Sequence, residues 1–176
     1  MVGYNIFRTE RPKKGGSGAI YIKSKFNAGI VLSESICKQL EFLALNMEIT
    51  KGLCITVVGC SRPPSVSKKA LQSLKYLLSR LNYSELVCDL NWDWLKPVSD
   101  DFKSLCDSIN FTQLVNSLTR PNLKSPEKST LIDLILTNVP HKFSSLGVFC
   151  NDLSDHCVVA AIRNTKMPNG VAVAQW

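Results

Sequence analysis

Polar side chains that can do chemistry lie at three places in the sequence. Asp89 and Asn91 stand in the stretch "VCDLNWDW", Asp133 interrupts the apolar stretch "TLIDLILTN", and Asp155 and His156 stand in the turn-like stretch "NDLSDH". Carboxylates and imidazoles are the groups that move protons, orient water or hold a divalent cation in hydrolytic sites. The same residue types also occur at ordinary strand ends and turns, so each stretch alone leaves both interpretations open.

Asp133 has the strongest requirement for a partner. Burying a carboxylate within an apolar strand costs several kcal/mol unless a cation or a hydrogen-bond donor compensates it. His156 is the natural partner if the strands that carry the two residues are neighbours. A carboxylate partner also fixes which ring nitrogen of a histidine carries the proton. We therefore expect an Asp133–His156 pair.

The elements that must position these residues are strands and helices in mixed order. Leucines at helical spacing predict a helix over residues 67–81, and a second helix is expected over residues 99–110. Residues 1–18 are expected to form a basic, glycine-rich loop. Apolar runs and apolar alternation predict strands over residues 19–26, 42–49, 53–60, 85–87, 111–115, 130–138, 145–150 and 157–162. This order predicts an α/β or α+β domain of layered sheets with helices outside.

Trp92, Asp93 and Trp94 complete the stretch around Asn91. The two tryptophans could stack on bases, but at this spacing tryptophans more often pack against a sheet edge or the following helix. We expect packing, with Asp93 in a supporting role.

The composition indicates a basic globular protein. The chain has 176 residues, which suits one domain, and a net charge of +7. That charge suits a polyanionic partner, although a merely basic soluble protein fits it equally. The start has no apolar signal segment, and no stretch is long enough to span a membrane. We therefore expect an intracellular protein, nuclear or cytoplasmic, without a membrane partner.

Seven cysteines are distributed through mostly apolar stretches, and no two of them form a CxxC pair. Cys150, His156 and Cys157 are close in sequence and could hold a metal. Cysteines in such surroundings more often serve as small apolar residues, so a metal site has weak support. We therefore expect thiols in a reducing compartment.

Four short stretches in a fixed order carry a family resemblance. They are "SRPPS", "CDLNWDW", "STLIDLILTN" and "SDHCVV". Together they resemble the endonuclease/exonuclease/phosphatase family. More closely, they resemble the apurinic-like endonuclease domain that accompanies the reverse transcriptase of a non-LTR (LINE-type) retrotransposon. The resemblance runs from about Tyr4 to about Arg163, which predicts a partial domain over residues 1–163 and a frayed tail over residues 164–176.

The resemblance implies a fold and an activity. The fold is a four-layer sandwich of two mixed β-sheets flanked by helices, here lacking its N-terminal strands. The activity is hydrolysis of a DNA phosphodiester with Mg²⁺ (or Mn²⁺), in which water attacks in line and the metal offsets charge on the leaving oxygen.

The resemblance also assigns roles to the polar residues. Asp89 matches the aspartate that positions and deprotonates the attacking water, and Asn91 matches the asparagine that holds this water and a phosphate oxygen. His156 matches the histidine that contacts the scissile phosphate. Asp133 matches the aspartate that orients this histidine, and Asp155 matches the metal-side aspartate. Further expected contacts with nucleic acid are Ser61, Arg62, Arg120 and Lys124.

Three departures from the family pattern bear on activity. A glutamate that is a principal metal ligand of the family precedes the point where this chain begins. Ser61 stands where a phosphate-contacting tyrosine is expected, and Cys88 stands where a tight turn favours glycine. Because the parts of a hydrolytic site act as a unit, losing one removes most of the rate. We therefore expect a DNA-nicking endonuclease that is impaired by truncation.

Two other functions fit the same residues. The chain can be an inactive remnant that at most binds nucleic acid through basic residues, or a phosphatase of small phosphate esters. The sequence does not decide whether the chain is an active enzyme, nor its oligomeric state. The basic residues considered for binding are Arg8, Arg11, Lys13, Lys14, Arg120, Lys124 and Lys128.

Overall fold

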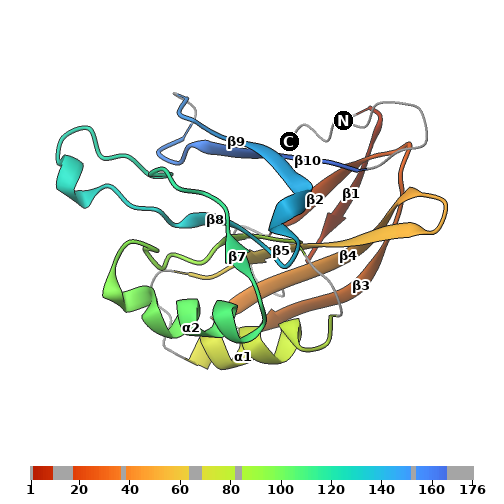
Figure 1. Cartoon of the computed structure of the whole chain (residues 1–176), viewed down its shortest axis with the longest axis horizontal. Coiled ribbons are helices and arrows are strands. Elements are labelled where there is room, and N and C mark those ends of the chain that lie inside the picture. Colours follow the sequence, from red (N-terminus) through yellow and green to blue (C-terminus); the bar gives the residue numbers. More distant parts are fainter. Residues whose placement is uncertain are drawn as a thin grey trace. The chain divides into compact units, whose positions relative to one another are not determined.

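A computed structural model describes most of the chain. It covers residues 2–9, 18–36, 39–63, 69–81, 85–151 and 154–165, and of residues 85–89 it describes the backbone alone. The chain divides into two compact units, Met1–Leu90 and Asn91–Trp176, each of which contains strands and an α-helix (Figure 1).

The first unit contains a hairpin and a mixed run of paired strands. The hairpin consists of β1 (Tyr4–Arg8) and β2 (Ala19–Lys23), which pair antiparallel. The run follows the order β3 (Asn27–Ile36), β4 (Leu40–Thr50), β5 (Leu53–Ser61) and β6 (Glu85–Asp89). The first three strands pair antiparallel, whereas β5 and β6 are parallel. A parallel pair requires a crossover connection, and α1 (Lys69–Leu78) lies within that connection.

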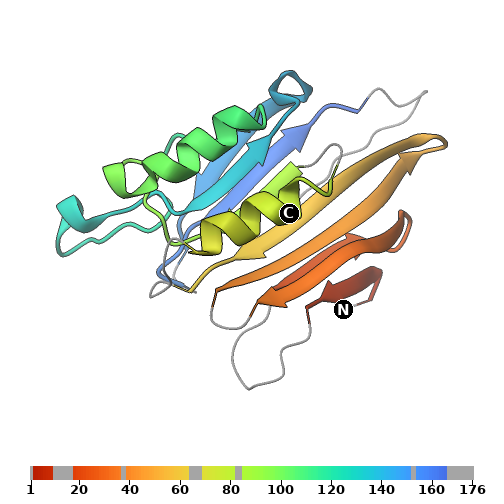
Figure 2. The same ribbon diagram turned by 90° about the horizontal axis from the view of Figure 1, so that it is seen from below.

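Strand β4 is the most deeply buried part of the first unit. It has a paired strand on each side, and residues 40–45 are all buried, which explains its nearly continuous apolar sequence "LEFLAL". Leu43, Leu45 and Met47 share a cluster with Ile20 and Ile22 of β2, so the hairpin covers this face. Helix α1 packs against β4. Its backbone is drawn in Figure 2, and its buried residues are Ala70, Leu74, Leu77 and Leu78.

The second unit contains α2 (Asp100–Ser108) and two antiparallel strand pairs. Short β7 (Thr112–Gln113) pairs with β8 (Asp133–Thr137), and β9 (Phe143–Phe149) pairs with β10 (Val158–Arg163). Short 3₁₀ turns occur at Pro97–Ser99, Pro126–Lys128 and Pro140–Lys142. The turn between β9 and β10 carries two of the predicted site residues.

The mixed helix and strand content that the sequence predicts is confirmed, as is the hairpin of β4 and β5. Two strands were missed, because residues 4–8 were taken for a loop and residues 27–36 were left unassigned. Most residues of β1 and β3 are exposed or half-buried, so they lack the apolar pattern that marks a strand. The predicted strand over residues 130–138 begins only at Asp133.

The turn predicted at Cys88 is wrong. Strand β6 continues through Asp89, and Cys88 lies opposite Cys60 in regular parallel register. The predicted domain over residues 1–163 stays a prediction, and residues 166–176 of the predicted tail lie outside the described residues. No helix within the described ranges is long and apolar enough to cross a membrane.

Candidate active site

The second unit joins Asp133 and His156 side chain to side chain. His156 Nδ1 lies 3.0 Å from both Oδ1 and Oδ2 of Asp133. The two side chains are 28% and 21% exposed respectively. An ionised carboxylate only accepts hydrogen bonds, so Nδ1 carries the proton and the Nε2 atom of the neutral ring is left as an acceptor. The predicted pair is confirmed.

The elements that bring the two residues together differ from those expected, which were two neighbouring strands. Asp133 is the first residue of β8, whereas His156 lies in the turn before β10, and β8 and β10 are not paired strands. The turn therefore makes the contact. Within it, the backbone N–H of His156 donates to Ser154 Oγ at 3.1 Å.

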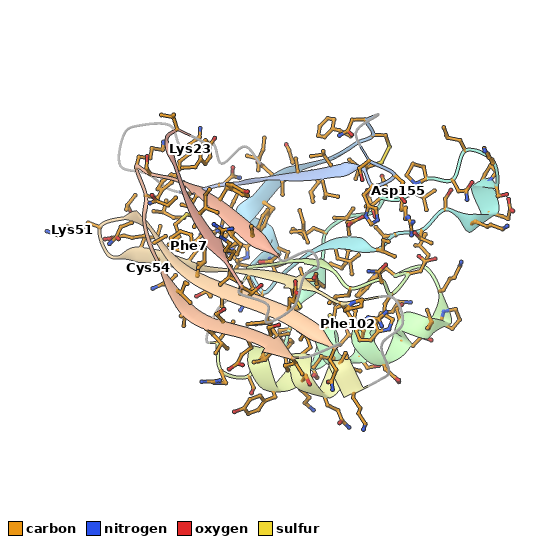
Figure 3. All side chains as sticks on the ribbon, turned by 180° about the vertical axis from the view of Figure 1, so that it is seen from behind. Phe7, Lys23, Lys51, Cys54, Phe102 and Asp155 are labelled. Carbon is orange, nitrogen blue, oxygen red and sulfur yellow. A yellow bond between two sulfur atoms is a disulfide. The ribbon has the colours of Figure 1, made fainter. Side chains whose placement is uncertain are left out.

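Asp155 forms a second pair, with Arg120. The guanidinium Nε and Nη2 atoms lie 2.8 and 2.6 Å from the same carboxylate oxygen, Oδ2. Both side chains are largely exposed, at 48% for Arg120 and 63% for Asp155, which is labelled in Figure 3. The hydrogen bond from Arg120 lowers the pKa of Asp155 below its ordinary value. Arg120, which was expected to contact nucleic acid, thus pairs with Asp155 in this structure.

Asp93 forms hydrogen bonds with the backbone of two separate segments. Asp93 is buried, and its Oδ1 accepts hydrogen bonds from the backbone N–H of Leu131 at 3.1 Å and of Leu95 at 3.3 Å. The Nζ of Lys96 lies 3.4 Å from Oδ2. Asp93 thus ties the segment after Asn91 to the segment that leads into β8, which is the supporting role that the sequence suggested.

The two tryptophans pack against the following helix, as expected. The rings of Trp92 and Trp94 lie 5.5 and 5.8 Å from the ring of Phe102, which is buried in α2. They anchor the segment that begins at Asn91. Asn91 itself is half-buried and has a φ of 51°, a left-handed conformation that asparagine adopts more readily than most residues. Such backbone outliers are concentrated at functional sites.

Ser61 and Asp89 are brought together in the first unit. Their Cα atoms are register partners at the ends of the parallel strands β5 and β6, where polar residues commonly form sites. The side chain of Asp89 lies outside the described part of the structure. Ser61 Oγ lies 3.4 Å from Oε2 of buried Glu41, which also accepts the backbone N–H of Gly18 at 3.1 Å.

Arg62 and Lys124, the remaining expected contacts with nucleic acid, have different surroundings. Arg62 is only 3% exposed, and its Nε donates a short hydrogen bond to the backbone carbonyl of Leu90. It supports the segment between Asp89 and Asn91, so a phosphate could reach it only after a rearrangement. Lys124 is exposed in the loop between β7 and β8. Of the other basic residues, Lys128 is exposed and Arg8 lies on β1, whereas Arg11, Lys13 and Lys14 fall outside the described residues.

The described residues do not by themselves fit a divalent metal. Among them, no group of three or more histidine, cysteine, aspartate or glutamate side chains could hold an ion. Asp155 is the predicted ligand, and its carboxylate is already engaged by a guanidinium. Mg²⁺ requires several oxygen ligands at close range, which one ion-paired carboxylate does not supply.

The cysteines were expected to be free thiols, and this prediction is wrong for two of them. Cys150 and Cys157 form a disulfide across the β9–β10 turn, because the register that pairs Phe149 with Val158 also places these neighbours opposite each other. Buried Cys60 and Cys106 do behave as small apolar residues. Burial, with a smaller contribution from Asp107, raises the pKa of Cys106 to about 12.

No protein-family model matches the chain, and no curated protein matches it. Solved structures do match. The endonuclease domain of TRAS1, a telomere-specific non-LTR retrotransposon, matches with a TM-score of 0.75 at 12% sequence identity, over 96% of this chain and 83% of that chain. An endonuclease/exonuclease/phosphatase family protein from Leptotrichia buccalis gives a TM-score of 0.63 at 16% identity, covering 92% of this chain and 72% of that one.

The chain has the endonuclease/exonuclease/phosphatase fold. A mannosyl-6-phosphatase from Bacteroides thetaiotaomicron also has this fold, with a TM-score of 0.58 at 15% identity over 90% of this chain and 76% of that one. The fold that the four sequence motifs predict is therefore confirmed. It is shared by proteins described as endonucleases and as phosphatases.

Proposed function

We propose that this chain is the endonuclease domain of a non-LTR retroelement and acts by hydrolysing DNA phosphodiesters. The Asp133–His156 pair carries this proposal, because it is a preformed acid–base couple on a fold that the TRAS1 endonuclease domain shares. The order of the four motifs supports the same assignment.

The chemistry that we propose for the pair follows from its geometry. Asp133 holds the proton on Nδ1, so Nε2 is the nitrogen that can face a substrate. In the protonated ring, Nε2–H donates to a phosphate oxygen and stabilises the negative charge that develops there. The Asp133 carboxylate, 3.0 Å from Nδ1, holds the ring in place while Nε2–H donates.

For Asp89 and Asn91 we propose the roles that the resemblance implies. Asp89 positions and deprotonates the attacking water, and Asn91 holds that water and a phosphate oxygen. The left-handed backbone of Asn91 and its anchoring by two packed tryptophans support a fixed position for this side chain. General acid–base groups of this kind contribute about 10²–10⁴-fold each.

We also propose that nicking requires Mg²⁺ or Mn²⁺. This requirement is implied by the family resemblance and not by any contact among the described residues. A bound cation would supply Lewis-acid stabilisation of charge on the leaving oxygen. Asp155 is the residue proposed to hold it, although the described residues do not fit a metal by themselves. Nicking in the presence of Mg²⁺ and its loss with a chelator would test the requirement.

DNA is the proposed partner. Exposed Arg120 and Lys124 both lie in the polar loop between β7 and β8 and are the proposed phosphate contacts, whereas Arg62 is buried. Because phosphate contacts release counterions, binding should weaken steeply as salt rises. The position of this loop next to Asp155 supports contacts near the reacting phosphate.

The test is nicking of supercoiled plasmid by the purified chain with Mg²⁺. His156→Ala should abolish nicking, because the group that stabilises the phosphate is lost. His141→Ala is the matched control: His141 is the other histidine of the chain and is exposed in the 3₁₀ turn Pro140–Lys142, so this variant should nick like the wild type. Equal background nicking by the wild type and His156→Ala would overturn the proposal.

A non-catalytic nucleic-acid binder is the second candidate. The engagement of Asp155 by Arg120 favours it, since the guanidinium contacts the carboxylate oxygen that a cation would use. Salt-sensitive binding of the plasmid without any nicking would identify this state. Hydrolysis of a phosphomonoester but not of DNA would point to phosphatase action instead.

A further inference from the structure

Thr119 connects the two segments that carry the Asp133–His156 pair. It is fully buried, and its Oγ1 accepts hydrogen bonds from the backbone N–H of Asp133 at 3.0 Å and of Ile132 at 3.2 Å. Its own carbonyl accepts the backbone N–H of Cys157 at 2.7 Å. One residue therefore fixes the backbone at Asp133 and the backbone directly after His156.

Further hydrogen bonds hold Thr119 itself in place. Its backbone N–H donates to the carbonyl of Thr130 at 3.0 Å, and the next residue, Arg120, forms an isolated β-bridge with Thr130. Arg120 also holds Asp155. Residues 119 and 120 thus contact the two short segments that carry the pair: the one that contains Asp133, and the one that contains Asp155, His156 and Cys157.

We propose that Thr119 is a positioning residue for the Asp133–His156 pair. Its hydroxyl sets where β8 begins, and its carbonyl sets where the β9–β10 turn ends, so the 3.0 Å contact between carboxylate and imidazole depends on it. The catalytic part of this inference rests on the proposed function, because Thr119 acts on a substrate only through the pair. The effect of Thr119 on the geometry of the pair does not depend on the proposed function.

The chain provides a matched control for a merely structural role. Thr137 is also fully buried, lies at the other end of β8, and accepts the backbone N–H of Val139 through Oγ1 at 3.1 Å. Thr119→Val and Thr137→Val each remove one buried hydroxyl from the same unit and leave a side chain of nearly the same shape. Loss of stability alone would affect both variants alike.

The first measurement reports on the pair without requiring activity. Long-range ¹H–¹⁵N NMR at a pH where imidazoles are neutral shows which ring nitrogen carries the proton. His141 and His156 are the two histidines, so His141→Ala assigns the spectrum. His156 should be protonated at Nδ1 in the wild type, in Thr119→Ser and in Thr137→Val. Thr119→Val should show a mixture of the two tautomers.

The second measurement separates the kinetic constants for nicking. Thr119→Val should lower kcat by about 10- to 100-fold, as expected for a small displacement of a reacting group, with little change in KM. Thr119→Ser retains the hydroxyl and should restore most of kcat. Thr137→Val should leave kcat near that of the wild type. If Thr119→Val does not fold, Thr119→Ala should give the same tautomer mixture and the same loss of kcat.

The outcomes distinguish this inference from the proposed function. An unchanged His156 tautomer in Thr119→Val, or equal effects of Thr119→Val and Thr137→Val, would overturn the role of Thr119. A tautomer mixture in Thr119→Val, in a protein whose wild type does not nick DNA, would support the positioning role and reject the endonuclease. A loss of kcat that Thr119→Ser does not restore would also count against Thr119.

Discussion

Two side-chain pairs lie in the second unit, and they are built differently. Asp133 and His156 are less than a third exposed, and the imidazole nitrogen is equidistant from both carboxylate oxygens. Arg120 and Asp155 are about half exposed or more, and both guanidinium nitrogens contact the same carboxylate oxygen. The same buried threonine holds the backbone beside both pairs, but the side chains of the second pair extend into solvent.

The difference separates a fixed contact from an exchangeable one. Water and salt screen an exposed ion pair, and such pairs contribute little to stability. Breaking a half-buried pair costs more stability, because a polar group that is left without its partner is also kept from water. We therefore expect Asp133 and His156 to keep their geometry when a substrate arrives, and Arg120 and Asp155 to be the pair that can change partners.

The largest expected effect comes from breaking the fixed pair. Asp133→Asn keeps the size of the side chain, but the amide presents a donor as well as an acceptor and no longer requires the proton on Nδ1 of His156. Nicking of plasmid should fall by about 10²–10⁴-fold, the usual contribution of a general acid–base group. Asp107→Asn, an exposed change on α2, is the control and should nick like the wild type. Equal rates for both variants would show that the pair is a structural contact only.

A smaller effect is expected from releasing the turn that carries one member of each pair. The Cys150–Cys157 disulfide closes this turn, with a sequence separation of 7. Cys150→Ser should lower the free energy of unfolding by about 2–3 kcal/mol without a reductant, because a short closed loop restrains the unfolded chain. Urea denaturation would measure the difference. Nicking should change less than in Asp133→Asn, since Asp133 and Thr119 still hold the turn.

Cys54→Ser is the control for this prediction, because Cys54 is an exposed free thiol beside Lys51 at the β4–β5 turn (Figure 3). With a dithiol reductant present, the wild type and Cys150→Ser should unfold at the same urea concentration. A Cys150→Ser variant as stable as the oxidised wild type would contradict the stabilising role of the disulfide.

The fixed pair could be predicted from the sequence, and the exchangeable pair could not. Asp133 stands within an apolar stretch, so a partner was required, and His156 was the suitable residue at the end of another strand. Asp155 and Arg120 are both hydrophilic residues in turn-like stretches, where neither requires a partner. Their contact depends on the path of the backbone around Thr119 and Thr130, which no local pattern encodes.

The same distinction applies to the fold. Strand β4 and helix α1 were predictable because their apolar spacing reflects burial. Edge strand β3 was missed because most of its residues face solvent. The Cys150–Cys157 disulfide depends on the β9–β10 register, which residues far from the two cysteines also determine. Thr119 gave no signal at all, since a single threonine before a basic loop has no characteristic spacing.

The smallest expected effect comes from the exchangeable pair. Arg120→Gln removes the hydrogen bond that lowers the pKa of Asp155, so this pKa should rise toward its ordinary value. NMR titration of the side-chain carboxyl would measure the change. Lys124→Gln, which removes the same charge from the same loop, is the control and should leave the pKa of Asp155 near that of the wild type.

The sign of the stability change follows from the direction of that shift. The folded-state pKa of Asp155 lies below the unfolded value of about 3.9, so the pair stabilises the fold above that pH and ceases to do so as the pH falls through the folded value. The wild type should therefore be slightly more stable than Arg120→Gln at neutral pH and equally stable in strong acid, and added salt should narrow the difference. A difference that persists in acid and in salt would mean that Arg120 stabilises the fold through packing. The Arg120–Asp155 ion pair would then contribute nothing measurable to the stability of the fold.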